Sequence, residues 1–208
     1  MSYTYDQQAI KKEIFDFIYV CAMHDAILQK AFKGEKKWVE KKETPKKILN
    51  SYLSKVLNNE FSSQENHDKV FLETVNKICS EINNNKPQNT ETDIFSFGNA
   101  QKLINITVKH IYTFCYNDPS LREGFRFCHC PVDIIMLEKV WHLCKGNFEL
   151  GKNKDFCKPW GSEGITDNTQ PELNEFPARY ALFQEAIKHL IGCGDMFPIE
   201  FDYVEWKK

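Results

Sequence analysis

A lysine and an aspartate that lie 31 residues apart are the side chains of this sequence best suited to joint chemistry. Lys102 stands near the start of a predicted helix, and Asp133 follows Pro131 at the start of another. A lysine attacks carbon only as the neutral amine, and the positive potential of a helix start favours that form. A neighbouring carboxylate stabilises a developing positive charge or moves a proton. The pair therefore predicts a nucleophile and its acid–base partner.

Each member of this pair also has a structural interpretation. Lys102 can be an ordinary surface lysine on an amphipathic helix, and Asp133 can be a helix cap. Taken singly, these interpretations are the better ones. Gly98 and Asn99, just before Lys102, would let a substrate backbone come close to the helix start.

A second candidate pair lies near the end of the chain. Asp202 and Trp206 are four residues apart, so on a helix they share one face. An aromatic ring beside a carboxylate acceptor suits a flat ligand with N–H donors, such as a nucleobase. The alternative is a short helix that pins a tryptophan into the core.

The triplet Cys128-His129-Cys130 invites comparison with zinc sites, with Cys144 and Cys157 downstream. Its C-x-C spacing differs from the usual C-x₂₋₄-C spacing of zinc sites, and no second close pair follows. Without an export signal, the eight cysteines are expected to be mostly reduced, buried thiols. The sequence therefore predicts neither a metal site nor a cofactor.

Composition excludes several classes of protein. The 208 residues can bury a real core, and 42% are hydrophobic. The formal charge is −2, so no overall basic character indicates nucleic-acid binding, and any such face must be local. No secretory signal and no long apolar stretch is present, which predicts a cytoplasmic protein that does not contact membranes.

Helical periodicity runs through most of the chain and predicts a compact all-α fold. In residues 6–32 the expected buried stripe includes Ile14, Phe17 and Ile18. Further helices are predicted after Thr44-Pro45, over 63–82, from Ser96, from Pro131 to Cys144, over 172–191 and from Pro198. The polar stretch 83–92 divides an N-terminal helical lobe, residues 1–94, from a second lobe, residues 95–208, with a cleft between them. The second lobe holds a long loop at 145–171.

Taken in order, these motifs resemble the helix-hairpin-helix DNA glycosylase superfamily, and most of all its archaeal 8-oxoguanine DNA glycosylase branch. That branch has a helix of the form K-x-I-x-x-x-V-K, then a P-V-D segment about thirty residues later. Near its end come a proline and an aspartate and tryptophan four apart. The matching segments here are Lys102–Lys109, Pro131–Asp133 and Pro198–Trp206, within residues 95–206. The family's usual Leu-Pro-Gly-x-Gly hairpin before the lysine is not present.

The resemblance implies a reaction and a partner. The partner would be DNA with a damaged or abasic nucleotide, bound by a monomer, and the target base would be extruded into a pocket. Lys102 would attack C1′ of the sugar and form a Schiff base, Asp133 would assist, and β-elimination would then nick the strand. Asp202, Trp206 and Pro131 would hold the base. The DNA backbone would be contacted by Gly98, Asn99 and Lys109, and no metal is needed.

Two other functions remain open from the sequence. The same fold can serve as a non-catalytic module that binds a nucleobase, a nucleic acid or a partner protein. It can also be a zinc-stabilised helical interaction protein.

Overall fold

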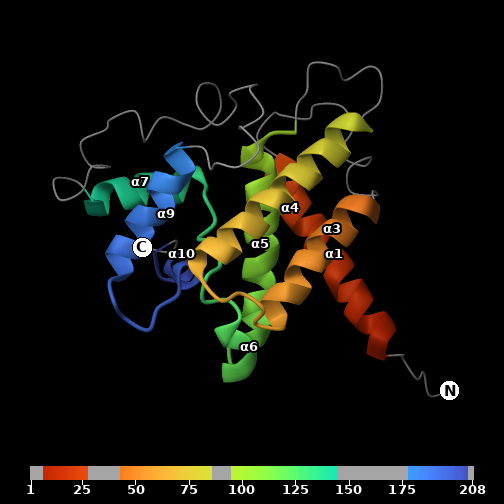
Figure 1. The fold of residues 1–208 in the computed structure, drawn as a ribbon, viewed down its shortest axis with the longest axis horizontal. Coiled ribbons are helices and arrows are strands. Elements are labelled where there is room, and N and C mark those ends of the chain that lie inside the picture. The colour runs from red at the N-terminus through yellow and green to blue at the C-terminus, as the bar shows by residue number, and fades with distance from the viewer. Residues whose placement is uncertain (1–6, 28–42, 86–94, 145–177, 206–208) are drawn as a thin grey trace.

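The computed structural model describes residues 7–27, 43–85, 95–144 and 178–205, and these form an all-α structure (Figure 1). No strand occurs among them, as predicted. No helix in these ranges is long and apolar enough to cross a membrane. The helices are α1 (Gln7–Ile27), α3 (Glu43–Leu57), α4 (Gln64–Asn84), α5 (Phe97–Cys115), α6 (Pro119–Glu123), α7 (Ile134–Cys144), α9 (Ala178–Ile191) and α10 (Pro198–Glu205).

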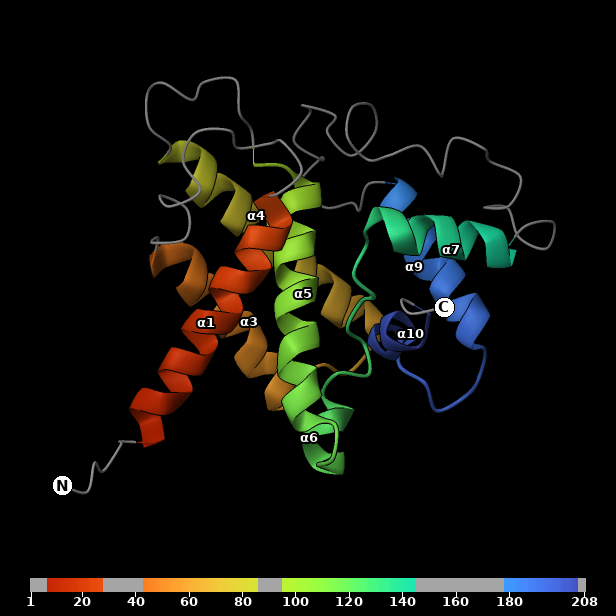
Figure 2. The same cartoon turned by 180° about the vertical axis from the view of Figure 1, so that it is seen from behind.

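Helix α5 stands at the centre, with α1 and α3 on one side, α7, α9 and α10 on the other, and α4 crossing it (Figures 1 and 2). Its start is fixed by a capping box. The Ser96 hydroxyl accepts from the Asn99 amide, and Asn99 Oδ1 accepts from the Ser96 amide at 3.0 Å. The Asn99 side chain also donates to the Ala26 carbonyl at 2.7 Å. The cap therefore ties the start of α5 to the last turn of α1.

The buried face of α1 differs from the predicted one. Ile18 is buried as expected, but Ile14 is 43% exposed and Phe17 is 70% exposed. The other buried positions described in α1 are Tyr19, Ala22, Met23 and Ala26, on a stripe rotated away from these two residues. Helix α1 packs obliquely against α5 (Figure 2), and contact with this partner helix, in addition to apolar character, decides which face of α1 is buried.

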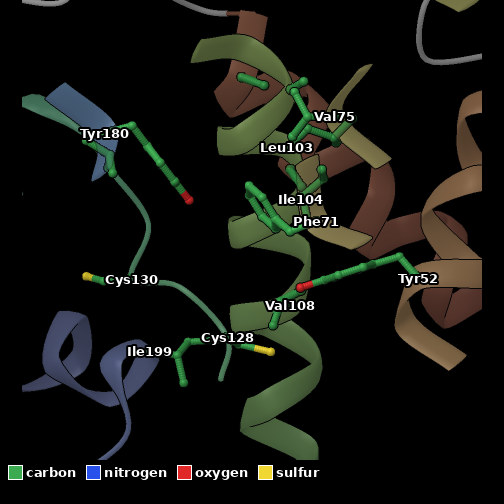
Figure 3. Packing of buried hydrophobic residues seen from close by; sticks show 14 of the residues in the cluster. Tyr52, Phe71, Val75, Leu103, Ile104, Val108, Cys128, Cys130, Tyr180 and Ile199 are labelled. Atoms are coloured by element: carbon green, nitrogen blue, oxygen red, sulfur yellow. The ribbon is translucent and has the colours of Figure 1, made fainter. Parts of the chain in front are cut away.

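One hydrophobic cluster joins the helices of both predicted lobes. Tyr52 and Phe71, from α3 and α4, pack in the same cluster as Leu103 of α5 and Tyr180 of α9 (Figure 3). The described core is therefore continuous across the predicted division near residue 94. Whether the two halves are separate lobes stays a prediction.

The segment after α5 differs in two places from the predicted elements. Asp118 caps a short helix, α6, where only a break was predicted. Helix α7 begins at Ile134, three residues after Pro131, because the Asp133 side chain accepts from the Met136 amide at 2.8 Å. The predicted helix from Pro131 would have placed Asp133 in its first turn. Asp133 is instead the residue before the helix and caps it.

The predicted helices from Ser96 and Pro198 and over 63–82 are confirmed to within a few residues. Helix α9 ends at Ile191, and the next residue, Gly192, has a φ of +62°, the left-handed conformation that favours glycine. The predicted loop 145–171, together with Cys157 and Trp206, lies outside the described residues.

Gly124 allows α6 to pack directly against the end of α3. A Cβ at this position would lie 2.0 Å from the Val56 carbonyl oxygen, which belongs to helical backbone. We expect Gly124→Ala to lower the free energy of unfolding by about 1–3 kcal/mol, because one of the two backbones must move. Urea denaturation measures this. Gly194→Ala is the matched control, since its Cβ would meet nothing closer than 3.5 Å. Equal losses in the two variants would contradict the close packing.

Candidate functional site

Three glutamines hold the non-helical segment that runs from α6 to Asp133. Gln184 of α9 bonds Cys130 twice, accepting from its amide at 3.1 Å and donating to its carbonyl at 2.9 Å. Gln64 of α4 donates to the Phe127 carbonyl at 3.0 Å. Gln101 of α5 donates to the Val132 carbonyl at 3.3 Å. Because helices α4, α5 and α9 all hydrogen-bond to this segment, the positions of His129 and Asp133 depend on how these three helices pack together.

Lys102 lies in the second turn of α5, since the helix begins at Phe97. The positive potential of a helix start falls off within the first turn, so the expected activation by that potential is weak at this position. Lys102 is half-buried, and it forms no hydrogen bond or ion pair with Asp133 among the described residues. Lys102 and Asp133 nonetheless lie next to a direct contact between α5 and the segment, because Gln101 and Val132 are their immediate neighbours in sequence.

Lys109 of α5 and Asp202 of α10 form an ion pair in which the carboxylate is buried and the lysine is half-buried. Asp202 is only 1% exposed, and burial raises the pKa of its carboxyl even though Lys109 lowers it. The Lys109 ammonium also lies 4.9 Å from the centre of the Tyr203 ring, and the Tyr203 hydroxyl donates to the Lys109 carbonyl at 2.6 Å. Lys109 is therefore a principal anchor of α10.

Asp133 and Asp202 influence one another electrostatically although they are 69 positions apart in sequence. The charge of Asp133 contributes to the raised pKa of Asp202. Burial raises the pKa of the Cys130 thiol, and the charges of Asp202 and Asp133 add to that effect. The structure thus brings together Asp133, Asp202 and Lys109, three of the predicted site residues.

The remaining predicted residues have identified places. Pro131 is buried beside Asp133. Asn99 uses its side chain in the capping box, and the Gly98 carbonyl accepts from Gln101 at 3.1 Å. The predicted DNA contacts of Gly98, Asn99 and Lys109, and the base contacts of Pro131 and Asp202, stay predictions.

The cysteines of the triplet are free thiols, and they do not converge on one point. Cys128 and Cys130 are buried, and their sulfur atoms point in opposite directions from the same segment (Figure 3). Burial raises the pKa of the Cys128 thiol to about 12, so the metal-binding thiolate is disfavoured there. Cys193, in contrast, is exposed. The triplet is therefore a poor two-cysteine ligand set.

A buried polar cluster that the sequence analysis missed surrounds His129. Asp68 Oδ1 lies 2.9 Å from His129 Nε2 and 3.0 Å from His67 Nδ1. The outer ring nitrogens contact buried tyrosines, His67 with the Tyr52 hydroxyl and His129 with the Tyr180 hydroxyl, both at 2.8 Å. The cluster therefore links α3, α4 and α9 through the segment that holds His129.

The cluster continues into α5 through amide side chains. The Asn105 side chain donates to the Tyr180 hydroxyl and to Gln101 Oε1, at 3.1 Å in each case. Gln101 in turn holds Val132, so hydrogen bonds connect Asp68 to the backbone beside Asp133. A sequence signal for the cluster exists. His67 falls on the apolar stripe of α4 with Phe71, and a fully buried histidine needs polar partners.

His67, Asp68 and His129 are the described side chains best arranged to hold a metal ion. Each offers one ligand atom, and the three atoms lie within 4.8 Å of one another. Burial lowers the pKa of His67 to about 4, so its imidazole is neutral near pH 7. Neutral imidazole and carboxylate are common ligands of zinc.

Comparisons of this chain with protein-family models, with curated proteins and with solved structures found no match.

Proposed function

We propose that this chain is a DNA base-excision glycosylase with AP-lyase activity, of the helix-hairpin-helix type. The observation that carries the proposal is the gathering of three charged residues: Asp133 just before α7, Asp202 of α10 and Lys109 of α5. These residues belong to the three motifs that resemble the archaeal 8-oxoguanine DNA glycosylases. Lys102 lies seven residues before Lys109, which is nearly two helical turns, so both lysines lie on the same side of α5.

In the proposed reaction, the Lys102 amine attacks C1′ of the damaged nucleotide and the base leaves. The Asp133 carboxylate stabilises the positive charge that develops on the sugar and carries the proton that the amine gives up. The resulting Schiff base allows β-elimination of the strand. The chain's own side chains supply this chemistry, so the reaction needs no metal at Lys102.

Borohydride trapping tests the proposal. Wild-type protein is mixed with duplex DNA that carries either 8-oxoguanine or an abasic site, and borohydride reduces any Schiff base to a stable amine. We expect a covalent adduct on a denaturing gel, and we expect Lys102→Gln to remove it. Lys69→Gln, at an exposed lysine of α4, is the matched control and should keep the adduct. No adduct with wild type, or an equal adduct with Lys102→Gln, would contradict the proposal.

A second candidate function is binding of a nucleobase or nucleic acid without catalysis. The observation that favours it is that Lys102 lies in the second turn of α5, where the helix potential is weak, and forms no bond with Asp133 among the described residues. This function predicts that Lys102→Gln leaves DNA affinity unchanged while no base is released. Fluorescence anisotropy with labelled DNA measures that affinity.

A further inference from the structure

The carboxylate of Asp68 is the convergence point of three nitrogen atoms. Besides His67 Nδ1 and His129 Nε2, the amide nitrogen of Gln64 lies 2.6 Å from Asp68 Oδ1. The same amide nitrogen lies 3.5 Å from each of the two histidine nitrogens. A positively polarised N–H group thus lies beside one carboxylate oxygen and two imidazole nitrogens.

We propose that His67, Asp68 and His129 form a binding site for a divalent transition-metal ion of the zinc type. The ion would take the place of the Gln64 amide nitrogen. The site goes beyond the proposed glycosylase function, since that chemistry uses Lys102 and needs no metal. It also departs from the metal-free expectation of the sequence analysis, which considered the cysteines as ligands.

Two of the three spacings among the ligand atoms are close to those around such an ion, and the third, between the two histidine nitrogens, is at most 4.8 Å. Ligand atoms about 2.0–2.1 Å from a tetrahedral zinc ion are about 3.3 Å apart from one another. The two distances from Asp68 Oδ1 to the histidine nitrogens, 2.9 and 3.0 Å, need to lengthen by only about 0.3 Å to reach that value. Two imidazoles and one carboxylate are a common protein ligand set for zinc.

The hydrogen bonds that orient the two histidine rings are of the kind found in metal sites. A metal-binding histidine uses one ring nitrogen for the ion and hydrogen-bonds a fixed partner with the other. Here the outer nitrogens of His67 and His129 lie 2.8 Å from the hydroxyls of Tyr52 and Tyr180. Both tyrosines are buried, and Tyr180 is held in turn by Asn105. The two rings are therefore held with their inner nitrogens toward Asp68.

Gln64, which contacts the cluster, also lines a hollow. Gln64 and Phe127 line a hollow of about 520 Å³ whose wall also holds Arg122, Arg126 and Lys188. The Asp68 side chain is 26% exposed, whereas both histidines are buried. Three protein ligands leave a fourth coordination position, which we place on the side of Gln64, the residue that contacts both the cluster and the hollow. Water or a small anion from the hollow can fill it.

The experiment uses the untagged full chain after treatment with a chelator and its removal. Zn²⁺ is titrated in competition with a chromophoric chelator, and Co²⁺ is added separately to record its visible absorption bands. We expect one Zn²⁺ per chain and the intense bands of four-coordinate Co²⁺. Mg²⁺, which prefers all-oxygen ligands, should not compete.

The variants separate this site from adventitious binding. His129→Gln and Asp68→Asn should each weaken Zn²⁺ binding at least 100-fold. Tyr180→Phe should weaken it about 10- to 100-fold by freeing the His129 ring. His24→Gln, at an exposed histidine of α1, and Cys193→Ser, at an exposed thiol, should leave it unchanged.

Gln64→Glu gives the sharpest contrast with a purely hydrogen-bonded cluster. If a metal binds, a carboxylate at the fourth position should tighten Zn²⁺ binding at least 10-fold. If the cluster only forms hydrogen bonds, the new charge beside Asp68 should destabilise the protein, and Zn²⁺ should not restore the loss. Failure to bind Zn²⁺, full binding by Asp68→Asn, or loss of binding in Cys193→Ser overturns the proposal. Should His129→Gln fail to fold, Asp68→Asn and Gln64→Glu decide the question.

Discussion

Replacing Asp133 with asparagine is expected to slow release of the damaged base by about 10²- to 10⁴-fold, the usual contribution of a general acid–base group. The fold should survive the change. Asp133 accepts the Met136 amide with Oδ1, and asparagine caps helices about as well as aspartate. Only the negative charge, which would stabilise the sugar cation, is lost. The measurement is single-turnover release of 8-oxoguanine from a duplex.

Asp118→Asn is the matched control for this change. Asp118 caps α6 in the same way, by accepting from the amides of Ser120 and Leu121. Both variants should keep a thermal midpoint close to that of wild type, and only Asp133→Asn should lose base release. If Asp133→Asn keeps the wild-type rate, or loses activity only because it unfolds, Asp133 is a helix cap and nothing more.

Replacing Lys109 with methionine is expected to lower the free energy of unfolding by about 3 kcal/mol, because it leaves a buried carboxylate without its cation. Asp202 is 1% exposed, so water cannot compensate for the lost charge. Adding Asp202→Asn to the variant removes the uncompensated charge and should restore part of the loss. Denaturant unfolding of both single variants and the double variant measures the coupling.

This loss should depend on pH in a defined direction. The pKa of Asp202 is raised in the folded protein, so the folded state holds the proton more tightly than the unfolded state does. The contribution of such a group is complete below its unfolded pKa, about 3.9, and is lost as pH rises through the folded value. Without Lys109 the pKa of Asp202 rises further. The cost of Lys109→Met should therefore be small near pH 4 and grow toward pH 7.

Lys55→Met is the control for this measurement. Lys55 is 42% exposed and lies 3.8 Å from Glu60, so its ion pair is a surface one and its loss should cost less than about 1 kcal/mol. If Lys109→Met costs no more than Lys55→Met, or if its cost does not change with pH, α10 is held by other contacts.

The sequence predicted most helices because their ends carry local signals. Ser96, Ser63 and Pro198 mark helix starts that depend on neighbouring residues alone. The buried face of α1 was missed because it depends on the partner helix. Ile14 and Phe17 are as apolar as a core stripe should be, yet close packing against α5 selects the side that carries Ala22 and Ala26.

The candidate site was predictable only in part for the same reason. Asp133 and Asp202 could be chosen by residue type and spacing, but their nearness depends on how α10 packs on α5. Lys109 was expected to face DNA, and its pairing with a buried aspartate could not be read from a surface pattern. In the cluster, Asp68 of α4 contacts His129, which is 61 positions later in the sequence. No local sequence motif predicts a contact over that separation.

The central position of α5 also restricts which changes of chain length the protein can accept. This one helix presents Gln101 to the segment before α7, Asn105 to Tyr180, and Lys109 to Asp202. Inserting or deleting one residue between Gln101 and Lys109 would rotate everything beyond it by about 100° and shift it by about 1.5 Å. Such a change would break either the first contact or the last. We therefore expect homologues of this chain to vary in side chains along α5 while keeping its residue count between these positions.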